Sequence, residues 1–322
     1  VGSGLFLLAL CMLYGITGHL LMSNIYTSVQ EIYANGTYMQ PLTVIIGFMI
    51  IGLGIKSALF PFHTWVPDSY GNSTVGSSAM LSSLVSKAYI VLLIKIIYRV
   101  IGIEVVRASG VLNIIFVFAL IGMLWGSVCA IRTDNVRRMI SFSSVAQIGY
   151  IYMGIGLGTT LGMTAAIFHI VSHGFMKALL FISAGELADS DALVDLKITA
   201  LHGARYRHRI ASSVFVLSSL SMVGIPFLSG FGSKFLFAVA GVTFNWQMYP
   251  ALICLAISTV LNAMYFLRTC IHVNIASDDL GRVKPERGFV LGVFAMCAVI
   301  VILGVLFAPV SKLIETGINM LA

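Results

Sequence analysis

The chain has 322 residues, of which 59% are hydrophobic and only 10% charged, and its mean hydropathy is +1.00. These values lie far outside the range of soluble globular domains and indicate a polytopic membrane protein in contact with the lipid bilayer. The formal net charge of +7 is typical of basic loops that set membrane topology, so no nucleic acid is expected as a partner.

Apolar runs of membrane-crossing length recur along the chain. A helix needs about 20 residues to cross a hydrocarbon core of roughly 30 Å, and lipid-exposed backbone must satisfy its hydrogen bonds within its own segment. The runs lie at about 3–23, 42–62, 74–98, 110–131, 138–157, 162–187, 210–243, 248–270 and 288–308. We therefore expect an all-α polytopic membrane protein with about nine transmembrane helices. Because Val1 is not Met and leads directly into an apolar helix, we expect a fragment rather than a signal peptide.

Loop charges predict the orientation. If 210–243 is one interrupted crossing, ten loop Lys and Arg lie on one side and three on the other. The ten are Arg132, Arg137, Arg138, Lys197, Arg205, Arg207, Arg209, Arg282, Lys284 and Arg287; the three are Arg99, Arg107 and Lys312. Basic loops stay cytoplasmic, so we expect the first set in the cytoplasm or matrix and the C-terminus on the opposite side. A re-entrant hairpin at 210–243 would switch every later loop.

Four lysines remain embedded once the loops are set aside: Lys56, Lys87, Lys177 and Lys234. An ionisable residue at the bilayer centre costs at least about 2.5–3.5 kcal/mol on insertion scales, which favours a functional role over snorkelling or structural lysines. Acidic partners are scarce, because Glu186 lies at a helix end and the other carboxylates lie in loops. Since desolvation disfavours the charged form, such lysines can release protons near neutral pH and suit a proton relay.

The stretch "FHIVSHGFMK" (168–177) places titratable groups at four-residue spacing. At 3.6 residues per turn, His169, His173 and Lys177 lie along one stripe about 12 Å long. Histidine suits proton transfer because one ring nitrogen can accept a proton while the other donates one. Two alternatives are a metal site, since His at i and i+4 can ligate zinc, and packing histidines. No Cys, Asp or Glu stands nearby as a third ligand, so we favour a relay and expect no metal.

Two segments are typical of interrupted helices. Glycine and proline flank Lys56 in "GLGIKSALFPFH" (52–63) and Lys234 in "GIPFLSGFGSK" (224–234). Proline removes a helical hydrogen bond and glycine loosens the backbone, and paired broken segments point to a transporter's ion site. The expected hinge residues are Pro61, Gly224, Pro226 and Gly230.

Redox chemistry is not indicated within this chain. The cysteines are scattered without a C-x-x-C pair, so neither a disulfide frame nor a metal site is expected. They are Cys11, Cys129, Cys254, Cys270 and Cys297. No nucleotide loop, flavin motif or nucleophilic triad is visible. We therefore expect no cofactor, and any driving reaction would reside in partner subunits.

Five blocks resemble the signature motifs of a known family. They are "KSALFPFHTWVPDSYG" (56–71), "LVSKAYIVLL" (84–93), "RTDNVRRMISFSSVAQIGYIYMGIG" (132–156), "IFHIVSHGFMKALLFISAG" (167–185) and "GIPFLSGFGSKF" (224–235). These look like the antiporter-like proton-pumping subunits of respiratory complex I, Mrp-type cation/proton antiporters and energy-converting membrane-bound hydrogenases. The resemblance covers nearly the whole chain in the family's order. One departure is Gln147, which stands where many members have His.

The resemblance implies a fold and its boundaries. The family has about fourteen helices with two inverted repeats of five, each containing a broken helix, and this chain would be its C-terminal part. Residues 1–109 would be the remainder of the first repeat, 110–270 the second repeat with the broken helix at 210–243, and 271–322 the C-terminal loop, last transmembrane helix and tail.

The resemblance also implies residue roles. Lys56 would be the lysine of the first broken helix, controlled by a glutamate upstream of Val1, and Lys87 the connecting lysine. His169, His173 and Lys177 would form the central relay, and Lys234 the group near the exit.

The function expected from residues and resemblance together is proton translocation coupled to redox chemistry or cation exchange. The chain would be a subunit of NADH:quinone oxidoreductase, a membrane-bound hydrogenase or an Mrp-type antiporter, beside other membrane subunits that include homologous antiporter-like ones. Its location would be a bacterial or archaeal cell membrane or an organellar inner membrane. The alternative is a secondary transporter that binds an organic solute at the two broken helices. A third possibility is a structural scaffold with inactive lysines.

Overall fold

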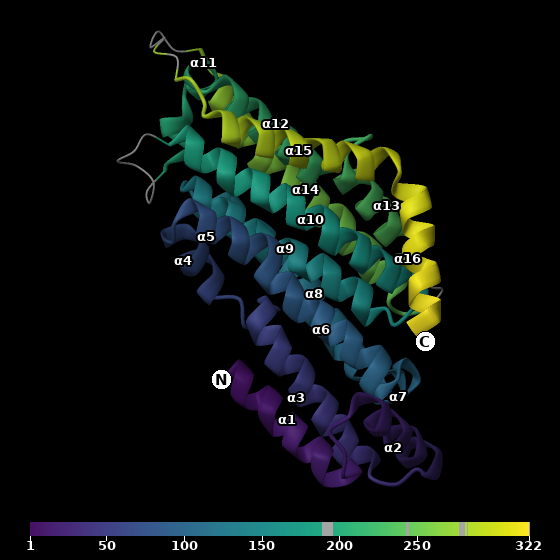
Figure 1. Cartoon of the computed structure of the whole chain (residues 1–322). Helices are drawn as coiled ribbons and strands as arrows, with labels where there is room; N and C mark the ends of the chain where they lie inside the picture. The colour runs from purple at the N-terminus through teal and green to yellow at the C-terminus, as the bar shows by residue number, and fades with distance from the viewer. Residues whose placement is uncertain (189–195, 243–244, 277–280, 282, 322) are drawn as a thin grey trace.

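The computed structural model describes residues 1–188, 196–242, 245–276, 281 and 283–321, and within these ranges the chain is helical with no strand. The first helices are α1 (Gly2–Thr17), α2 (Met22–Asn35), α3 (Met39–Ser57), α4 (Trp65–Asn72), α5 (Val75–Met80), α6 (Ser86–Ile96) and α7 (Ile103–Ala108), with π turns η1 (Leu81–Val85) and η2 (Ile97–Ile101). The later ones are α8 (Val111–Arg132), α9 (Val136–Gly156), α10 (Thr160–Leu187), the 3₁₀ turn η3 (Ile198–Leu201), α11 (Ala204–Arg207), α12 (Arg209–Val223), α13 (Ser229–Gly241), α14 (Met248–Asn274), α15 (Arg287–Val305) and α16 (Phe307–Leu321). The long helices lie side by side across the molecule (Figure 1).

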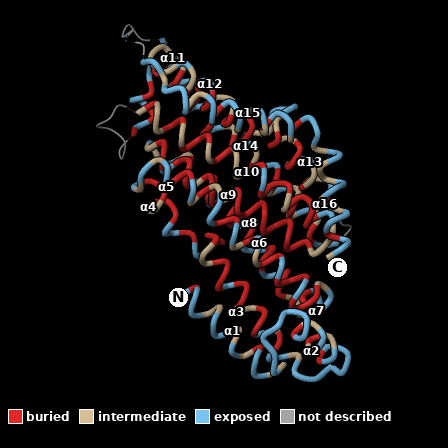
Figure 2. Tube along the Cα trace, viewed as in Figure 1, coloured by how far each residue is buried: buried red, intermediate tan, exposed pale blue. Residues whose placement is uncertain are grey.

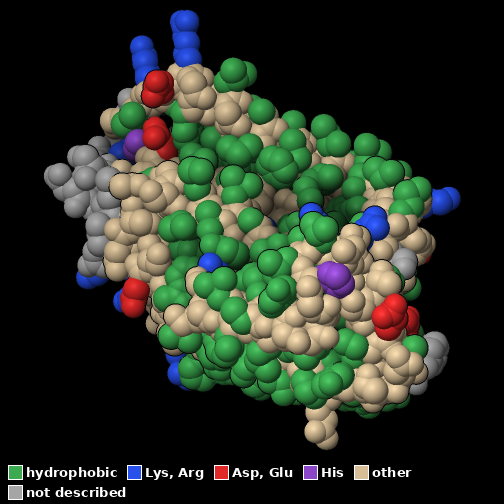
Figure 3. Space-filling model, turned by 60° about the horizontal axis from the view of Figure 1, so that its bottom comes forward, with side chains coloured by type: hydrophobic (Ala, Val, Ile, Leu, Met, Phe, Trp, Pro, Cys, Tyr) green, Lys and Arg blue, Asp and Glu red, His purple; other side chains and the backbone are tan. Residues whose placement is uncertain are grey.

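Six of the described helices are long and apolar enough to cross a membrane, or seven if the bent pair α1 and α2 is one span. They are Met39–Ser57, Val75–Ile101, Val111–Arg132, Thr160–Leu187, Met248–Asn274 and Arg287–Val305. The expected count of nine is not confirmed. The α9 helix has the length of a span but carries two arginines, three serines and Gln147, while α12 and α13 are each short. This is an integral membrane protein, and hydrophobic side chains cover much of the face shown in Figure 3, with carboxylates near the margins of the view.

The core lies where α8, α9 and α10 pack together, and most residues of α9 and α10 are buried (Figure 2). Small residues bring α8 and α9 close. A Cβ added at Gly126 would lie 2.6 Å from the Ala146 nitrogen, and one added at Gly149 would lie 2.8 Å from the Ala119 oxygen. Close backbone approach through small residues is the usual way membrane helices pack, because lipid supplies no hydrophobic force between them.

Both segments predicted to be interrupted lack continuous helix. The α3 helix ends at Ser57, Ala58 has φ 67°, and Pro61 lies in the turn before α4 begins at Trp65. The α12 helix ends before Gly224, which has φ 98°, and α13 begins at Ser229.

The second break depends on close backbone approach. Pro226 lies in the turn between α12 and α13. A Cβ added at Gly230 would lie 1.7 Å from the Ser221 carbonyl oxygen, so only glycine fits there. The start of α13 therefore packs directly against the last turn of α12.

Two expectations about the ends of elements differ from the structure. The run 3–23 is not one helix, because Gly18 is left-handed (φ 70°) and α2 continues at 65° to α1. Arg137, counted with the loop charges, is buried in the first turn of α9. Arg282, from the same set, lies outside the described residues.

Candidate functional site

The histidine stripe lies at the centre of α10. The rings of His169 and His173 stack with their centroids 5.4 Å apart and their planes 7° from parallel. His169 Nδ1 lies 3.0 Å from the Ser233 hydroxyl of α13. Among the described groups, His169 Nε2 and both ring nitrogens of His173 are buried and have no hydrogen-bond partner in the protein. Internal water commonly satisfies such groups, and a neutral imidazole can accept a proton at one ring nitrogen while it donates one from the other.

Lys177 ends the stripe and reaches α9 instead of the histidines. Its fully buried ammonium donates to the Ile140 carbonyl at 2.7 Å and to the Ser143 hydroxyl at 2.5 Å. The Ser143 hydroxyl also donates to the Ile140 carbonyl at 2.8 Å. Carbonyl and hydroxyl dipoles can stabilise an ammonium without fixing it as a carboxylate would, so both protonation states are compatible with this position.

Lys87 binds to its own helix at the π turn. Its ammonium donates to the Ser82 carbonyl and lies 3.3 Å from the Ser86 hydroxyl. The π turn packs against α10, the helix that carries His173 and Lys177. The structure therefore brings Lys87 to the stripe as a neighbouring charge.

Lys234 lies at the second helix break. Its ammonium donates to the Val223 carbonyl at 2.7 Å, at the C-terminal end of α12. This end of a helix carries partial negative charge, which stabilises a cation. The ammonium also lies 5.9 Å from the centre of the Tyr150 ring, which in turn stacks on His169 at 5.9 Å. Tyr150 thus lies between the stripe and Lys234.

Lys56 stands apart from the other predicted residues. It lies in the last turn of α3, half-buried, with its ammonium 4.8 Å from the centre of the Tyr89 ring. The next residue, Ser57, shares a 2.6 Å hydrogen bond with the Tyr152 hydroxyl of α9. Lys56 therefore contacts α6, the helix that carries Lys87, at the ring of Tyr89.

The ammonium groups around the stripe bind carbonyls and hydroxyls. None of the carboxylates that the structure describes is buried, and the described ion pairs, such as Arg268 with Asp134 and Arg138 with Asp68, are solvent-exposed. No group of three or more His, Cys, Asp or Glu that could hold a metal ion occurs in the described ranges.

Several side chains at the site escaped the sequence prediction. They include Ser143 and Tyr150 on α9 and Ser233 on α13. The signal was present, because residues 140, 143, 147 and 150 recur at helical spacing and place Ser143, Gln147 and Tyr150 on one face of an otherwise apolar segment. The carbonyl ligands, Ser82, Ile140 and Val223, have no side-chain signal.

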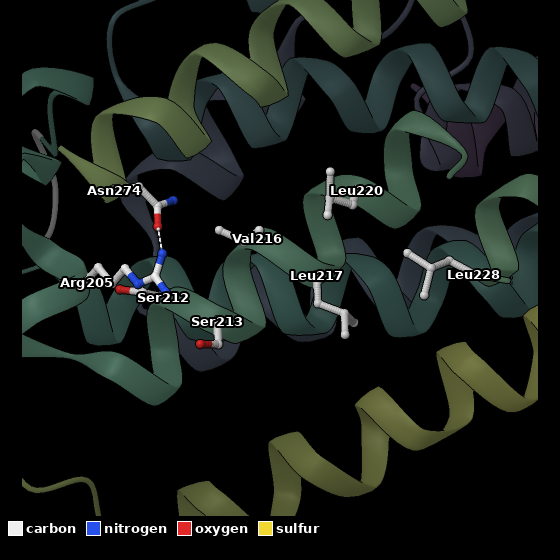
Figure 4. Close-up of a pocket in the computed structure, with 8 residues that line it drawn as sticks. All are labelled: Arg205, Ser212, Ser213, Val216, Leu217, Leu220, Leu228 and Asn274. Carbon is white, nitrogen blue, oxygen red and sulfur yellow. Dashed lines mark hydrogen bonds between the residues drawn. The ribbon is translucent and has the colours of Figure 1, made fainter. Parts of the chain in front are cut away.

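The surface cleft along α12 does not contain the predicted relay. It has a volume of about 280 Å³, with Arg205 donating to Asn274 at 2.6 Å at one end and Leu220 and Leu228 towards the other (Figure 4). None of the six predicted lysines and histidines lines it. The candidate site is therefore a buried line of groups and not an open pocket.

Comparison with known proteins identifies the family. Residues 1–262 match the membrane family described as NADH:quinone oxidoreductase/Mrp antiporter. The chain belongs to this family. It is 31% identical over 286 residues to NADH-quinone oxidoreductase subunit N of Desulforudis audaxviator, which covers 88% of this chain and 54% of the relative. It is 28% identical over 261 residues to a component of the Na(+)/H(+) antiporter of Alkalihalophilus pseudofirmus, covering 81% and 51%.

Solved structures of multisubunit membrane complexes contain similar chains. A chain of the membrane-bound sulfane sulfur reductase, an archaeal respiratory membrane complex, superposes with a TM-score of 0.87 at 26% identity, covering 99% of this chain and 63% of that one. A chain of the Mrp complex from Dietzia gives 0.82 at 21% identity, with 98% and 65% covered, and shares the fold. This family member thus spans about half the length of the curated relatives it matches.

Proposed function

We propose that this chain is a proton-translocating, antiporter-like subunit of a multisubunit respiratory or antiporter complex. The observation that carries the proposal is the line of titratable groups on α6, α10 and α13. Lys87 and Lys177 are buried, Lys234 is half-buried, and all three bind only carbonyls and hydroxyls in the contacts described. Buried cations without carboxylate partners exchange protons more readily than fixed ion pairs. The similar proteins from Desulforudis and Alkalihalophilus belong to an NADH-quinone oxidoreductase and a Na(+)/H(+) antiporter.

In this proposal the groups titrate as a coupled set. A proton held at Lys87 disfavours a second one at His173 or Lys177, because like charges repel in a poorly solvated interior. The stacked imidazoles of His169 and His173 pass the proton along α10 with intervening water. Lys234, at the end of α12, receives it beyond His169 and Tyr150. Lys56 begins the line at the first break.

The organisation of the chain is part of the same proposal. Residues 1–109 belong to the first inverted repeat and 110–270 to the second, with 271–322 as the C-terminal segment. The basic loops face the cytoplasm or matrix, and protons enter from that side. Driving reactions reside in partner subunits of the same membrane complex, including homologous antiporter-like ones.

Proton flux in liposomes tests the class of function. The assembled complex is reconstituted with a pH-sensitive dye inside the vesicles, and flux is measured with its driving reaction or a Na⁺ gradient. The proposal expects proton movement that depends on this drive and not on organic solutes. Flux that requires a solute would favour the transporter alternative, and an assembled, driven complex that moves no protons would contradict the proposal.

A further inference from the structure

Tyr70 is a fully buried tyrosine on α4, between the first helix break and the Lys87 helix. Its ring is enclosed edge-on by Trp65 at 5.9 Å and by Phe181 of α10 at 6.2 Å. Its hydroxyl donates to the Leu81 carbonyl at 3.3 Å and faces the Ser86 hydroxyl. The side chain therefore contacts the first residue of the π turn that separates α5 from α6 and lies near Ser86, the first residue of α6.

This π turn supplies the ligands of Lys87. The Ser82 carbonyl, which binds the ammonium, directly follows Leu81, and the Ser86 hydroxyl is the second ligand. A π turn has wider hydrogen-bond spacing than the α-helix around it and often marks a functional position. Since Tyr70 binds at Leu81 and faces Ser86, its position fixes where the Lys87 ligands lie.

Arg137 holds Tyr70 from the other side. Its guanidinium, only 3% exposed, donates to the Tyr70 carbonyl at 3.3 Å, to the Ser73 carbonyl and to the Ser78 hydroxyl at 2.8 Å. These groups lie at the C-terminal end of α4 and the start of α5, where helix carbonyls lack intrahelical donors. One guanidinium nitrogen, Nη2, makes all three contacts and thus ties the end of α4 to α9.

The opposite end of α4 contacts the first break. The Trp65 indole donates to the Ile55 carbonyl at 3.1 Å, and Ile55 directly precedes Lys56. A continuous set of contacts therefore runs from the turn beside Lys56 through Trp65 and Tyr70 to the ligands of Lys87. Coupling between sites requires such an element whose position both sites can bias.

We propose that Tyr70 is a positioning residue for Lys87 and that α4 transmits a change at Lys56 to the Lys87 ligands. The proposal rests on the proposed proton relay. A displacement of α3 at the break moves Trp65, the α4 helix carries Tyr70 with it, and the π turn loosens its carbonyl and hydroxyl from the ammonium. Lys56 and Lys87 are then coupled through backbone position as well as through charge.

The test is Tyr70→Phe in the assembled complex, which removes one oxygen and keeps the ring. We expect normal assembly, a proton-translocation rate lowered about five- to tenfold, as for a lost hydrogen bond of roughly 1 kcal/mol, and a half-maximal rate shifted to lower pH. The shift follows because an ammonium with loosened ligands holds its proton less tightly. Tyr249→Phe, at a tyrosine that is 68% exposed, is the matched control and should leave rate and profile unchanged.

A second variant tests the inference if Tyr70→Phe does not assemble. Arg137→Lys keeps the cation, but its side chain is one bond shorter than the reach to Nη2, the nitrogen that donates in all three contacts, so it should shift the pH profile in the same direction. Unchanged profiles in Tyr70→Phe would overturn the inference, as would an unchanged Arg137→Lys if Tyr70→Phe did not assemble. Lys177→Ala, measured beside them, separates the positioning role of Tyr70 from the proton relay. If Lys177→Ala loses transport while Tyr70→Phe behaves normally, only the positioning role is overturned. Normal transport in Lys177→Ala overturns the relay itself.

Discussion

The His169 imidazole and the Ser233 hydroxyl lie 3.0 Å apart, which joins the stripe of α10 to the residue directly before Lys234. The contact links two parts of the proposed relay that lie on different helices. His169 reaches α13 by this bond and reaches Lys234 through the Tyr150 ring. Both connections are between segments far apart in the chain.

We expect Ser233→Ala to slow proton translocation by roughly five- to tenfold, since a hydrogen bond of about 1 kcal/mol to a buried imidazole is lost. Flux assays on the reconstituted complex measure this. Ser213→Ala is the control, because Ser213 is exposed on α12 and bonds only its own helix at Arg209 in the contacts described. An unchanged rate in Ser233→Ala would show that His169 does not depend on this hydroxyl.

The Lys234 position separates hydrogen bonding from proton release. In Lys234→Gln the amide can still donate to the Val223 carbonyl, but it cannot release a proton at neutral pH. The complex should therefore assemble with normal yield and lose at least about tenfold in flux, as expected for loss of a proton-transfer group. Size-exclusion profiles and flux are the two readouts. Normal flux would remove Lys234 from the relay.

The second break should be intolerant of any side chain at Gly230. An alanine Cβ there would lie 1.7 Å from the Ser221 carbonyl oxygen, so α12 and α13 must separate. We expect Gly230→Ala to cost roughly 3 kcal/mol or more, the upper range for overpacking, and to lower the thermal unfolding temperature in detergent. Gly47→Ala is the control, because a Cβ there meets no atom within 4 Å. Equal unfolding temperatures for Gly230→Ala and Gly47→Ala would contradict the close contact between Gly230 and Ser221.

Adjacent arginines should behave differently when truncated. Arg137 is buried against the carbonyls of Tyr70 and Ser73, whereas Arg138 pairs with Asp68 on the surface, where both side chains are about half exposed or more. We expect Arg138→Ala to change stability by less than about 1 kcal/mol. Arg137→Ala removes a buried cation that donates to the Tyr70 and Ser73 carbonyls, of which the Tyr70 carbonyl still accepts from the Ser78 hydroxyl, and it should cost more than Arg138→Ala, about 1–3 kcal/mol. Thermal unfolding of the two variants gives the comparison, and similar losses would contradict it.

The helix interruptions and the histidine stripe could be predicted from the sequence, because each depends on residues that are close together in the chain. Glycine and proline marked both interruptions, and four-residue spacing placed His169 and His173 on one face, as their stacked rings show. The family was also identifiable from contiguous motifs, and the match over residues 1–262 confirms it. The roles assigned to the individual lysines and histidines stay predictions.

The ligands of the embedded lysines could not be predicted from the sequence, because they are mostly backbone carbonyls. Whether Lys177 turns toward His173 or toward Ile140 depends on how α9 packs against α10, and no residue type signals that choice. Arg137 was misplaced for a related reason. Charge alone indicates a loop, and only the neighbouring end of α4 shows that its guanidinium has buried acceptors.

The central claim is that protons pass through the α10 line, and Lys177→Ala tests it most directly. The variant complex is reconstituted in liposomes beside Lys312→Ala, at an exposed lysine of α16. Subunit composition is checked for both, and the initial rate of driven proton translocation is compared with that of the unmodified complex. We expect normal assembly in both variants, an unchanged rate for Lys312→Ala and loss of translocation for Lys177→Ala. A fully assembled Lys177→Ala complex that moves protons at the normal rate would contradict the central claim.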